Sequence, residues 1–286
     1  SEPLASPSEC VFPKASGKVK PGALVPSFNI RDSVAATCDS GVFHGMMQPT
    51  SRGRNAAMSR LLFEIKTPSV PVAGGAELFP VHRIYCVGQN YAAHTREMGS
   101  DPDRAPPFYF SKPADAIVQN GARIPFPSRT SELHHEIELV VAIGKGGSGI
   151  SAGDASSHIY GYAVGIDLTR RDLQAQAKKA GRPWDTAKGF DCSAPISNIH
   201  RAADIGHPDK GRIWLAVNGK VRQDGNLEEL IWSVPEAVAE LSTYFELHPG
   251  DLLFTGTPSG VGAVQRGDRI TGGIDGIDEI AVEIAA

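Results

Sequence analysis

The pattern of apolar and polar residues along the chain predicts more strands than helices. Short apolar runs typical of buried strands occupy residues 83–87, 136–143, 160–167 and 251–254. Asn218-Gly219 separates the segments 213–217 and 220–223, which predicts a hairpin with a type I′ turn. Further strand patterns fill the C-terminal end. Because helices do not regularly separate these strands, the pattern argues against a doubly wound α/β sheet.

Capping signals predict two helices. Thr169 can cap a helix from Arg170 to about Ala180, with Gly181 ending it. Ser233-x-x-Glu236 forms a capping box that opens a second helix, which reaches about Phe245. Residues 90–98 can form a helical turn or two. The expected fold class is therefore α+β and β-rich.

The N-terminal fifth of the chain differs from the rest. Residues 1–57 are rich in Ser, Ala, Pro and Gly and keep no helix or strand period, so we expect a disordered N-terminal extension before a single domain at 58–286. Met58 is a plausible natural start. A cleaved transit peptide is the rival interpretation, but acidic residues are uncommon in such peptides, and four occur here: Glu2, Glu9, Asp32 and Asp39.

Composition narrows the class of protein. A net charge of −4 and a pI near 6.1 give no sign of nucleic-acid binding. The four cysteines form no C-x-x-C pair, so a zinc-thiolate site or a disulfide framework is not expected and a reducing, cytoplasmic location fits best. The sequence contains no apolar run of about 18 residues and no secretory signal, which predicts no membrane span.

Three acidic residues form the main candidate site. Glu136 and Glu138 are two apart on a predicted strand and therefore share a face. Asp167 ends another apolar strand. Neighbouring carboxylates repel unless a cation lies between them, and oxygen ligands suit Mg²⁺, Mn²⁺ or Ca²⁺. The alternative is a solvated strand face bearing two acids, with Asp167 serving as a turn residue or as an acid at a helix start.

His94 and Glu97 are candidates for proton transfer. They are three apart in a segment that can be helical, so they can share a face. A carboxylate beside an imidazole fixes its tautomer and raises its basicity, which favours a general base. An exposed helical ion pair is the alternative.

Polar residues after Asp167 are candidates for binding a substrate. Arg171 and Gln174 are three apart on the predicted helix, and Lys188 lies beyond it. The loop 255–260 (TGTPSG) can present hydroxyls and backbone N–H groups to an anion. The alternatives are solvated side chains and an ordinary Gly/Pro turn.

The order of several motifs resembles that of one family. The motifs are CVGQNYAAHTREMG (86–99), PFYFSKPADAI (107–117), LHHEIELVVAIGK (133–145), GYAVGIDLTRRDLQ (161–174), GRPWDTAKGFDCSAPIS (181–197), NGKVRQDGN (218–226) and DLLFTGTPSGVG (251–262). Together they resemble the fumarylacetoacetate hydrolase superfamily from residue 61 to the C-terminus. Residues 79–116 are particularly similar to bacterial fumarylpyruvate hydrolases.

The resemblance implies a mixed β-sandwich roll with short peripheral helices, a homodimer and a catalytic domain at 58–286. It implies that Glu136, Glu138 and Asp167 bind Mg²⁺, or Mn²⁺ or Ca²⁺. It implies a catalytic dyad of His94 and Glu97, with Lys188 polarising the substrate. It places three further residues in the substrate pocket: Arg171, Gln174 and Thr257. Relatives commonly carry Arg where this chain has Gln89, so the pocket entrance lacks that cation.

The implied activity is metal-dependent hydrolysis of the C–C bond of an acylpyruvate, a small 2,4-diketo acid. Fumarylpyruvate is the expected substrate, giving fumarate and pyruvate in gentisate breakdown. One alternative within the superfamily is an oxaloacetate decarboxylase, or an isomerase or decarboxylase of ring-cleavage products. An alternative of another class is a non-catalytic metal- or ligand-binding protein on the same fold.

Overall fold

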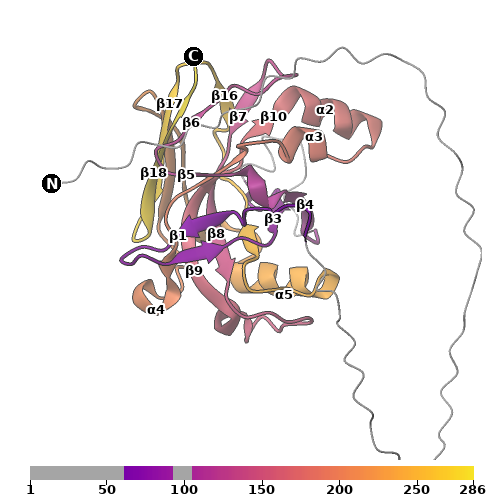
Figure 1. The fold of residues 1–286 in the computed structure, drawn as a ribbon, viewed down its shortest axis with the longest axis vertical. Helices are drawn as coiled ribbons and strands as arrows, with labels where there is room; N and C mark the ends of the chain where they lie inside the picture. The colour runs from indigo at the N-terminus through magenta and orange to yellow at the C-terminus, as the bar shows by residue number, and fades with distance from the viewer. Residues whose placement is uncertain (1–60, 93–104) are drawn as a thin grey trace, which may run out of the picture. The chain divides into compact units, whose positions relative to one another are not determined.

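The computed structural model describes residues 61–92 and 105–286 (Figure 1). The residues from Lys66 onward form a compact unit. The expected N-terminal extension, the dyad of His94 and Glu97, and two of the four cysteines lie outside the described residues. The other two cysteines, Cys86 and Cys192, are buried and free.

An eight-stranded mixed sheet forms the centre of the fold. Its strands, in spatial order, are β4 (Phe108–Lys112), β3 (Ile84–Gly88), β15 (Leu252–Phe254), β8 (Ile137–Ile143), β9 (Ile159–Ile166), β11 (Ala194–Ile196) and β5 (Ile117–Gln119). β12 (His200–Arg201) pairs with β9. The pairs β15–β3 and β11–β5 are parallel and the others are antiparallel, so the sheet is mixed as expected.

A second sheet of five strands supplies the facing layer. Its order is β14 (Lys220–Asn226), β13 (Arg212–Val217), β17 (Arg269–Ile274), β18 (Asp278–Ile284) and β6 (Arg123–Ile124). Smaller sheets join β10 (Thr169–Arg170), β7 (Leu133–His135) and β16 (Gly262–Val264), and separately β1 (Ser69–Pro71) and β2 (Leu78–Pro80).

The helices are short and lie around these sheets (Figure 1). They are α2 (Arg171–Ala180), α3 (Asp185–Lys188), α4 (Ala202–Ile205) and α5 (Val234–Tyr244). Single 3₁₀ turns occupy η1 (Ala114–Ala116), η2 (Ala155–His158) and η3 (Leu227–Glu229). No helix within 61–92 and 105–286 combines the length and the apolar character needed to cross a membrane. Strands thus dominate, which confirms the expected β-rich fold class.

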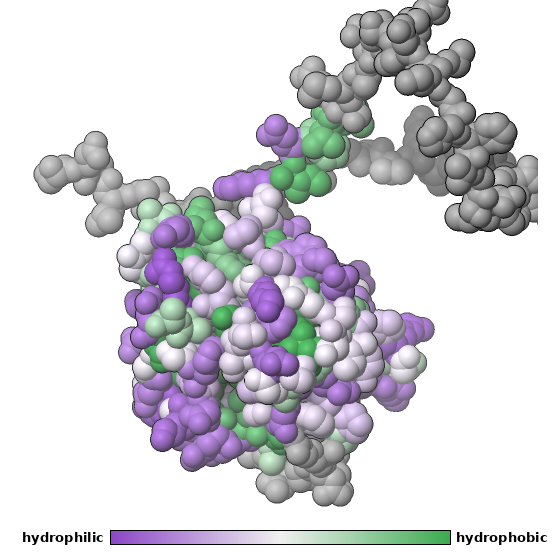
Figure 2. Space-filling view, turned by 90° about the horizontal axis from the view of Figure 1, so that it is seen from below, coloured by the Kyte–Doolittle hydropathy of each residue, from purple (hydrophilic) through white to green (hydrophobic). Residues whose placement is uncertain are grey.

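The strand β8 is buried along its whole length, which explains its continuous apolar run. Ile137 and Leu139 face one core, which includes residues of β13, β17 and β18. Val140 faces a second core with Ile84 and Phe254. Glu138 shares the face of Val140, because alternate residues of a strand point the same way. On the face shown in Figure 2, by contrast, apolar residues lie in small areas among hydrophilic ones.

The local predictions are largely confirmed. The hairpin β13–β14 turns at Asn218 and Gly219, whose φ angles of 51° and 76° suit a type I′ turn. The capping box is present, because the Glu236 carboxylate accepts the Ser233 N–H at 3.0 Å and the Ser233 side chain accepts the backbone N–H of Glu236. Gly181 ends α2 in the left-handed conformation, with φ 60°.

The predicted cap of α2 is wrong. Thr169 belongs to β10, and its hydroxyl donates to the main-chain carbonyl of Asp167 at 3.2 Å. The helix begins at Arg171 instead. The carboxylate of Asp172 accepts the N–H of Leu173 at 2.9 Å and so satisfies one of the unpaired donors of the first turn. Pairing of β10 with β7 holds Thr169 in an extended strand, which overrides its preference for a capping position.

Candidate metal centre

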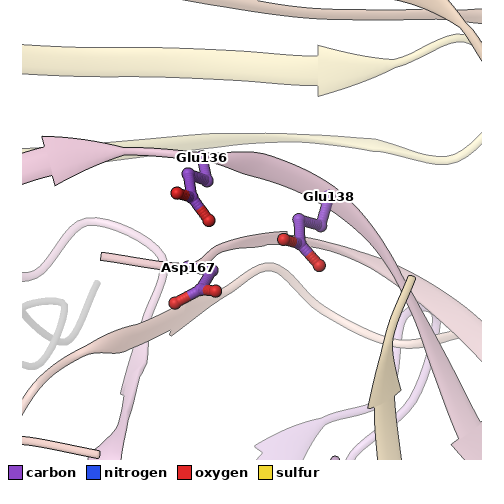
Figure 3. Close-up of side chains that lie close together, drawn as sticks. All are labelled: Glu136, Glu138 and Asp167. Atoms are coloured by element: carbon purple, nitrogen blue, oxygen red, sulfur yellow. The ribbon is translucent and has the colours of Figure 1, made fainter. Parts of the chain in front are cut away.

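The three acidic residues converge although they come from separate segments (Figure 3). Glu136 lies between β7 and β8, Glu138 is in β8, and Asp167 follows β9. β8 and β9 are antiparallel, and the Asp167 N–H donates to the Glu136 carbonyl at 2.8 Å. Each residue offers a carboxylate oxygen, and these oxygens lie within 4.8 Å of one another. All three side chains are buried, so a solvated acidic strand face is excluded.

Two cations that the sequence singled out contact this group. Lys188 Nζ donates to Glu136 Oε2 at 2.7 Å and to Asp167 Oδ2 at 2.5 Å. Arg171 Nη2 donates to Glu136 Oε1. Burial lowers the pKa of Lys188, but the charges of Asp167 and Glu136 more than offset it, so the pKa is raised. Lys188 therefore keeps its charge at neutral pH.

A third cation, Lys112, was not singled out by sequence reasoning. Its side chain is fully buried, and its Nζ lies 2.8 Å from Asp167 Oδ1. The same ammonium donates to the main-chain carbonyls of Leu168, at 3.1 Å, and Lys188. Lys112 ends β4 and shares a face of that strand with Phe108 and Phe110. A lysine on an apolar strand face is unusual, and this was the signal in the sequence that could have identified it.

Glu138 has a different environment from the other two acids. Within the described residues its hydrogen-bond donor is the N–H of Gly256, at 2.8 Å, and no cation pairs with it. Burial, followed by the charges of Asp167 and Glu136, raises the pKa of Glu138 well above its usual value. An unpaired buried carboxylate is costly, and a bound cation removes that cost.

A second observation also fits a bound cation. Asp167 Oδ1 is buried, and although Lys112 lies near it, no described residue gives it a well-aligned hydrogen bond. It can therefore offer a lone pair to a ligand. Oxygen donors from Glu136, Glu138 and Asp167 suit a hard divalent cation such as Mg²⁺, Mn²⁺ or Ca²⁺. The residues present thus fit the expected metal.

Two hydroxyls of the loop after β15 bind the backbone of β8, the strand that carries Glu138. The Thr255 hydroxyl donates to the Leu139 carbonyl at 3.0 Å, and the Thr257 hydroxyl donates to that of Ile137 at 2.7 Å. Thr257 still lines a cavity beside the carboxylates, and its role in binding a substrate stays a prediction. Gly256 has φ 98°, and a Cβ there would meet the Cβ of Asn90 at 2.8 Å.

A buried glutamine links this loop to the second sheet. Gln223 of β14 donates to Thr257 Oγ1 at 2.8 Å and to the Pro258 carbonyl at 2.9 Å. Its Oε1 accepts the Ile137 N–H at 3.1 Å and lies 2.9 Å from His135 Nδ1. Burial lowers the pKa of His135, so this histidine is neutral and donates from Nδ1. Sequence reasoning missed Gln223 and His135.

A cavity opens beside the carboxylates. One wall is a face of α2 that carries Arg171, Gln174 and Lys178. Arg171 is held in place, because Nη1 donates to Gln174 Oε1 at 2.6 Å and Nε lies 3.4 Å from His134 Nδ1, in addition to its contact with Glu136. Thr257 also lines the cavity. The structure thus brings the predicted pocket residues to the metal group.

Part of the cavity lining is aromatic. The rings of Phe108 and Phe110 lie 5.3 Å and 5.8 Å from that of Trp184, and all three residues line the cavity. Gln89 also lines it, in the left-handed conformation with φ 58°. Apolar rings beside a charged group suit a ligand with an anionic end and a hydrocarbon part.

Comparisons with known proteins agree with this site. Residues 83–285 match the family described as fumarylacetoacetate (FAA) hydrolase C-terminal. A fumarylpyruvate hydrolase from Ralstonia sp is 49% identical over 177 residues, which cover 62% of this chain and 92% of the relative. A mitochondrial oxaloacetate tautomerase from Arabidopsis thaliana is 41% identical over 202 residues, covering 71% and 90%.

A solved structure is also similar. Fumarylpyruvate hydrolase from Pseudomonas aeruginosa, in complex with Mn²⁺ and pyruvate, shares 52% sequence identity with a TM-score of 0.78. The match covers 79% of this chain and 99% of that one. That relative binds a divalent metal, in agreement with the carboxylate group found here.

Proposed function

Because the chain belongs to the fumarylacetoacetate hydrolase family, we propose that it is a metal-dependent hydrolase that cleaves the C–C bond of an acylpyruvate. Fumarylpyruvate is the proposed substrate, and fumarate and pyruvate are the proposed products. The observation that carries the proposal is the buried group of Glu136, Glu138 and Asp167, with a lysine ammonium on two of its carboxylates. The similarity to two fumarylpyruvate hydrolases supports the choice of substrate.

Glu136, Glu138 and Asp167 would hold the metal, for which Mg²⁺ is the first candidate. A divalent ion in this position supplies Lewis-acid polarisation of the oxygens of a 2-keto acid. Lys188 uses two of its three N–H bonds on carboxylates, which leaves one for a substrate oxygen. Breaking the C–C bond leaves an electron pair on the pyruvate part, and the Lys188 ammonium can stabilise the resulting charge on oxygen.

Attack on the distal carbonyl requires a water that loses a proton. We assign this proton transfer to His94, oriented by Glu97, on the basis of sequence resemblance alone. His94 would take the proton from water and return it to the carbon that leaves as pyruvate. The aromatic wall of Phe108, Phe110 and Trp184 would keep other water away from the reacting atoms.

A second candidate reaction comes from the other relatives. The matched proteins include an oxaloacetate tautomerase from Arabidopsis thaliana and a 5-carboxymethyl-2-hydroxymuconate delta-isomerase from Mycobacterium smegmatis, the latter with 34% sequence identity. Oxaloacetate is a 2-keto acid, and a 2-hydroxymuconate is the enol form of one, so a metal that binds a 2-keto acid end would suit both compounds. A third possibility, binding without catalysis, predicts metal affinity with no turnover of any of these compounds.

One set of assays separates these candidates. Purified protein is given fumarylpyruvate, acetylpyruvate and oxaloacetate in parallel, with Mg²⁺, with Mn²⁺ and with a chelator. The proposal expects fast release of pyruvate from fumarylpyruvate, and its loss in the chelator. If the protein converts oxaloacetate but neither acylpyruvate, the second candidate, a reaction of oxaloacetate, is supported instead. The expected homodimer and the cytoplasmic location stay predictions, and light scattering in solution tests the former.

A further inference from the structure

The cavity beside the metal group is lined by three basic residues with unequal surroundings: Arg171, Lys178 and Lys188. Lys188 is bound to two carboxylates. Arg171 is bound to Glu136 and Gln174. Lys178 is exposed, and its ammonium forms no hydrogen bond or ion pair with residues 61–92 or 105–286. It is therefore the cation of this cavity that is available to a ligand without breaking a contact within those ranges.

The helix places this ammonium away from the carboxylates. Arg171, Gln174 and Lys178 are spaced by three and four residues along α2, so they share one face. A rise of 1.5 Å per residue puts the Lys178 backbone about 10 Å beyond that of Arg171 along the helix axis. Long helical side chains lean toward the N-terminus, which brings the Lys178 ammonium back over the cavity.

We propose that Lys178 binds the terminal carboxylate of the substrate's acyl group and so selects acylpyruvates that carry a second carboxylate. This inference rests on the proposed function. In fumarylpyruvate the two carboxylates are separated by six C–C bonds, or about 8 Å when each bond is near 1.5 Å. With the 2-keto acid end at the metal group, the far carboxylate comes within reach of a lysine on the next turns of α2.

Arg171 is less suited to this task. Its guanidinium compensates the charge of Glu136, which is buried beside two other acids. Moving it to a substrate would break its contacts with Glu136 and Gln174. Lys178 is exposed before binding, so ordering it costs mainly the entropy of its side chain. The flat, unsaturated acyl chain would then lie along Phe108 and Trp184.

The first test compares two substrates that differ in the far carboxylate. Fumarylpyruvate has it and acetylpyruvate does not. We expect Lys178→Gln to raise KM for fumarylpyruvate by about tenfold or more, the worth of one charge-assisted hydrogen bond, with kcat little changed. KM for acetylpyruvate should change less than about twofold. Lys178→Glu should have the larger effect on fumarylpyruvate, and Lys178→Arg should restore most of the affinity.

The chain supplies a matched control in Lys179. It is the next residue of α2, is also exposed and is absent from the cavity wall. Lys179→Gln changes the net charge of the protein by the same amount, so it reports general electrostatic effects. An equal rise of KM in Lys179→Gln, or an equal rise for both substrates in Lys178→Gln, would overturn the assignment.

A binding measurement separates this inference from the proposed function. 2-Oxoheptanedioate and 2-oxoheptanoate share the 2-keto acid end and the chain length, and neither has the second ketone needed for cleavage. Calorimetry with the Mg²⁺-loaded protein should show tighter binding of the dicarboxylate, and Lys178→Gln should abolish that difference. If the protein cleaves neither acylpyruvate, the proposed hydrolysis is wrong, yet this pair still decides the role of Lys178. Equal affinity for the two acids in the unmodified protein refutes it.

Discussion

The buried lysine Lys112 gives the most demanding test of how the metal group is held. Its ammonium has Asp167 Oδ1 at 2.8 Å and donates to the carbonyls of Leu168 and Lys188, and the side chains of Lys112 and Asp167 are fully buried. Lys112→Met removes the cation and leaves these oxygens buried. Breaking a buried pair from one side costs about 3–5 kcal/mol of the free energy of unfolding. For a domain of this size, each kcal/mol lowers Tm by roughly 2–4 °C, so a fall of roughly 6–20 °C is expected.

Urea unfolding measures the free energy and thermal unfolding measures Tm. Both are followed by tryptophan fluorescence, in a chelator so that no metal contributes. Lys145→Met is the control, because this lysine is exposed and its loss should change the free energy of unfolding by less than about 0.5 kcal/mol. In an Asp167→Asn background the cost of Lys112→Met should shrink by about 1.5–3 kcal/mol, because the charge partner is gone. Two results would refute the ion-pair reasoning. One is the same loss of unfolding free energy from Lys112→Met with and without Asp167→Asn, and the other is a loss below about 1 kcal/mol when Asp167 is present.

Three further predictions concern metal binding, proton transfer and the pH dependence of stability. Glu138→Gln should weaken Mg²⁺ binding measured by calorimetry by well over tenfold, and unchanged affinity would remove Glu138 from the metal site. His94→Ala should lower kcat by about 10²–10⁴-fold with metal affinity intact, and full activity would exclude the dyad. Burial, followed by the charge of Arg171, lowers the pKa of His134 to about 4, from 6.5 when unfolded. The unfolded chain thus binds more protons between these values, and stability present above pH 6.5 is lost as the pH falls toward 4. In a chelator, His134→Asn should flatten this loss by about 1–2 kcal/mol, discounted for partial exposure, and an identical pH profile of unfolding would contradict the shift.

The acidic group could be predicted because its signals are local. Glu136 and Glu138 interrupt an apolar strand at a spacing of two, and Asp167 ends the next strand. The predicted strand 136–143 lies close to the observed β8 for the same reason, since β8 is buried on both faces and all its residues except Glu138 are apolar. The family resemblance then supplied the roles of residues whose isolated patterns are ambiguous.

The contacts of the supporting residues could not be predicted from local patterns, even where a residue such as Lys112 stands out in its own segment. Gln223 contacts His135 across 88 positions of sequence, and Lys112 contacts Asp167 from another strand, so neither contact leaves a periodic signal. The sequence of the loop after β15 allowed its hydroxyls and backbone N–H groups to face an anion, with an ordinary Gly/Pro turn as the alternative. In the fold, pairing of β15 with β8 places Leu139 and Ile137 carbonyls beside them, and these take both hydrogens.

The position of β8 between two cores has a consequence for exchange of amide hydrogens. Its backbone pairs with β15 on one side and β9 on the other, while its side chains are buried on both faces. Such a strand opens to solvent only when the whole domain unfolds. Two of the three acidic residues therefore sit on or beside the segment whose amides should exchange most slowly, so removing the ion should leave their spacing intact and rebinding should need no refolding.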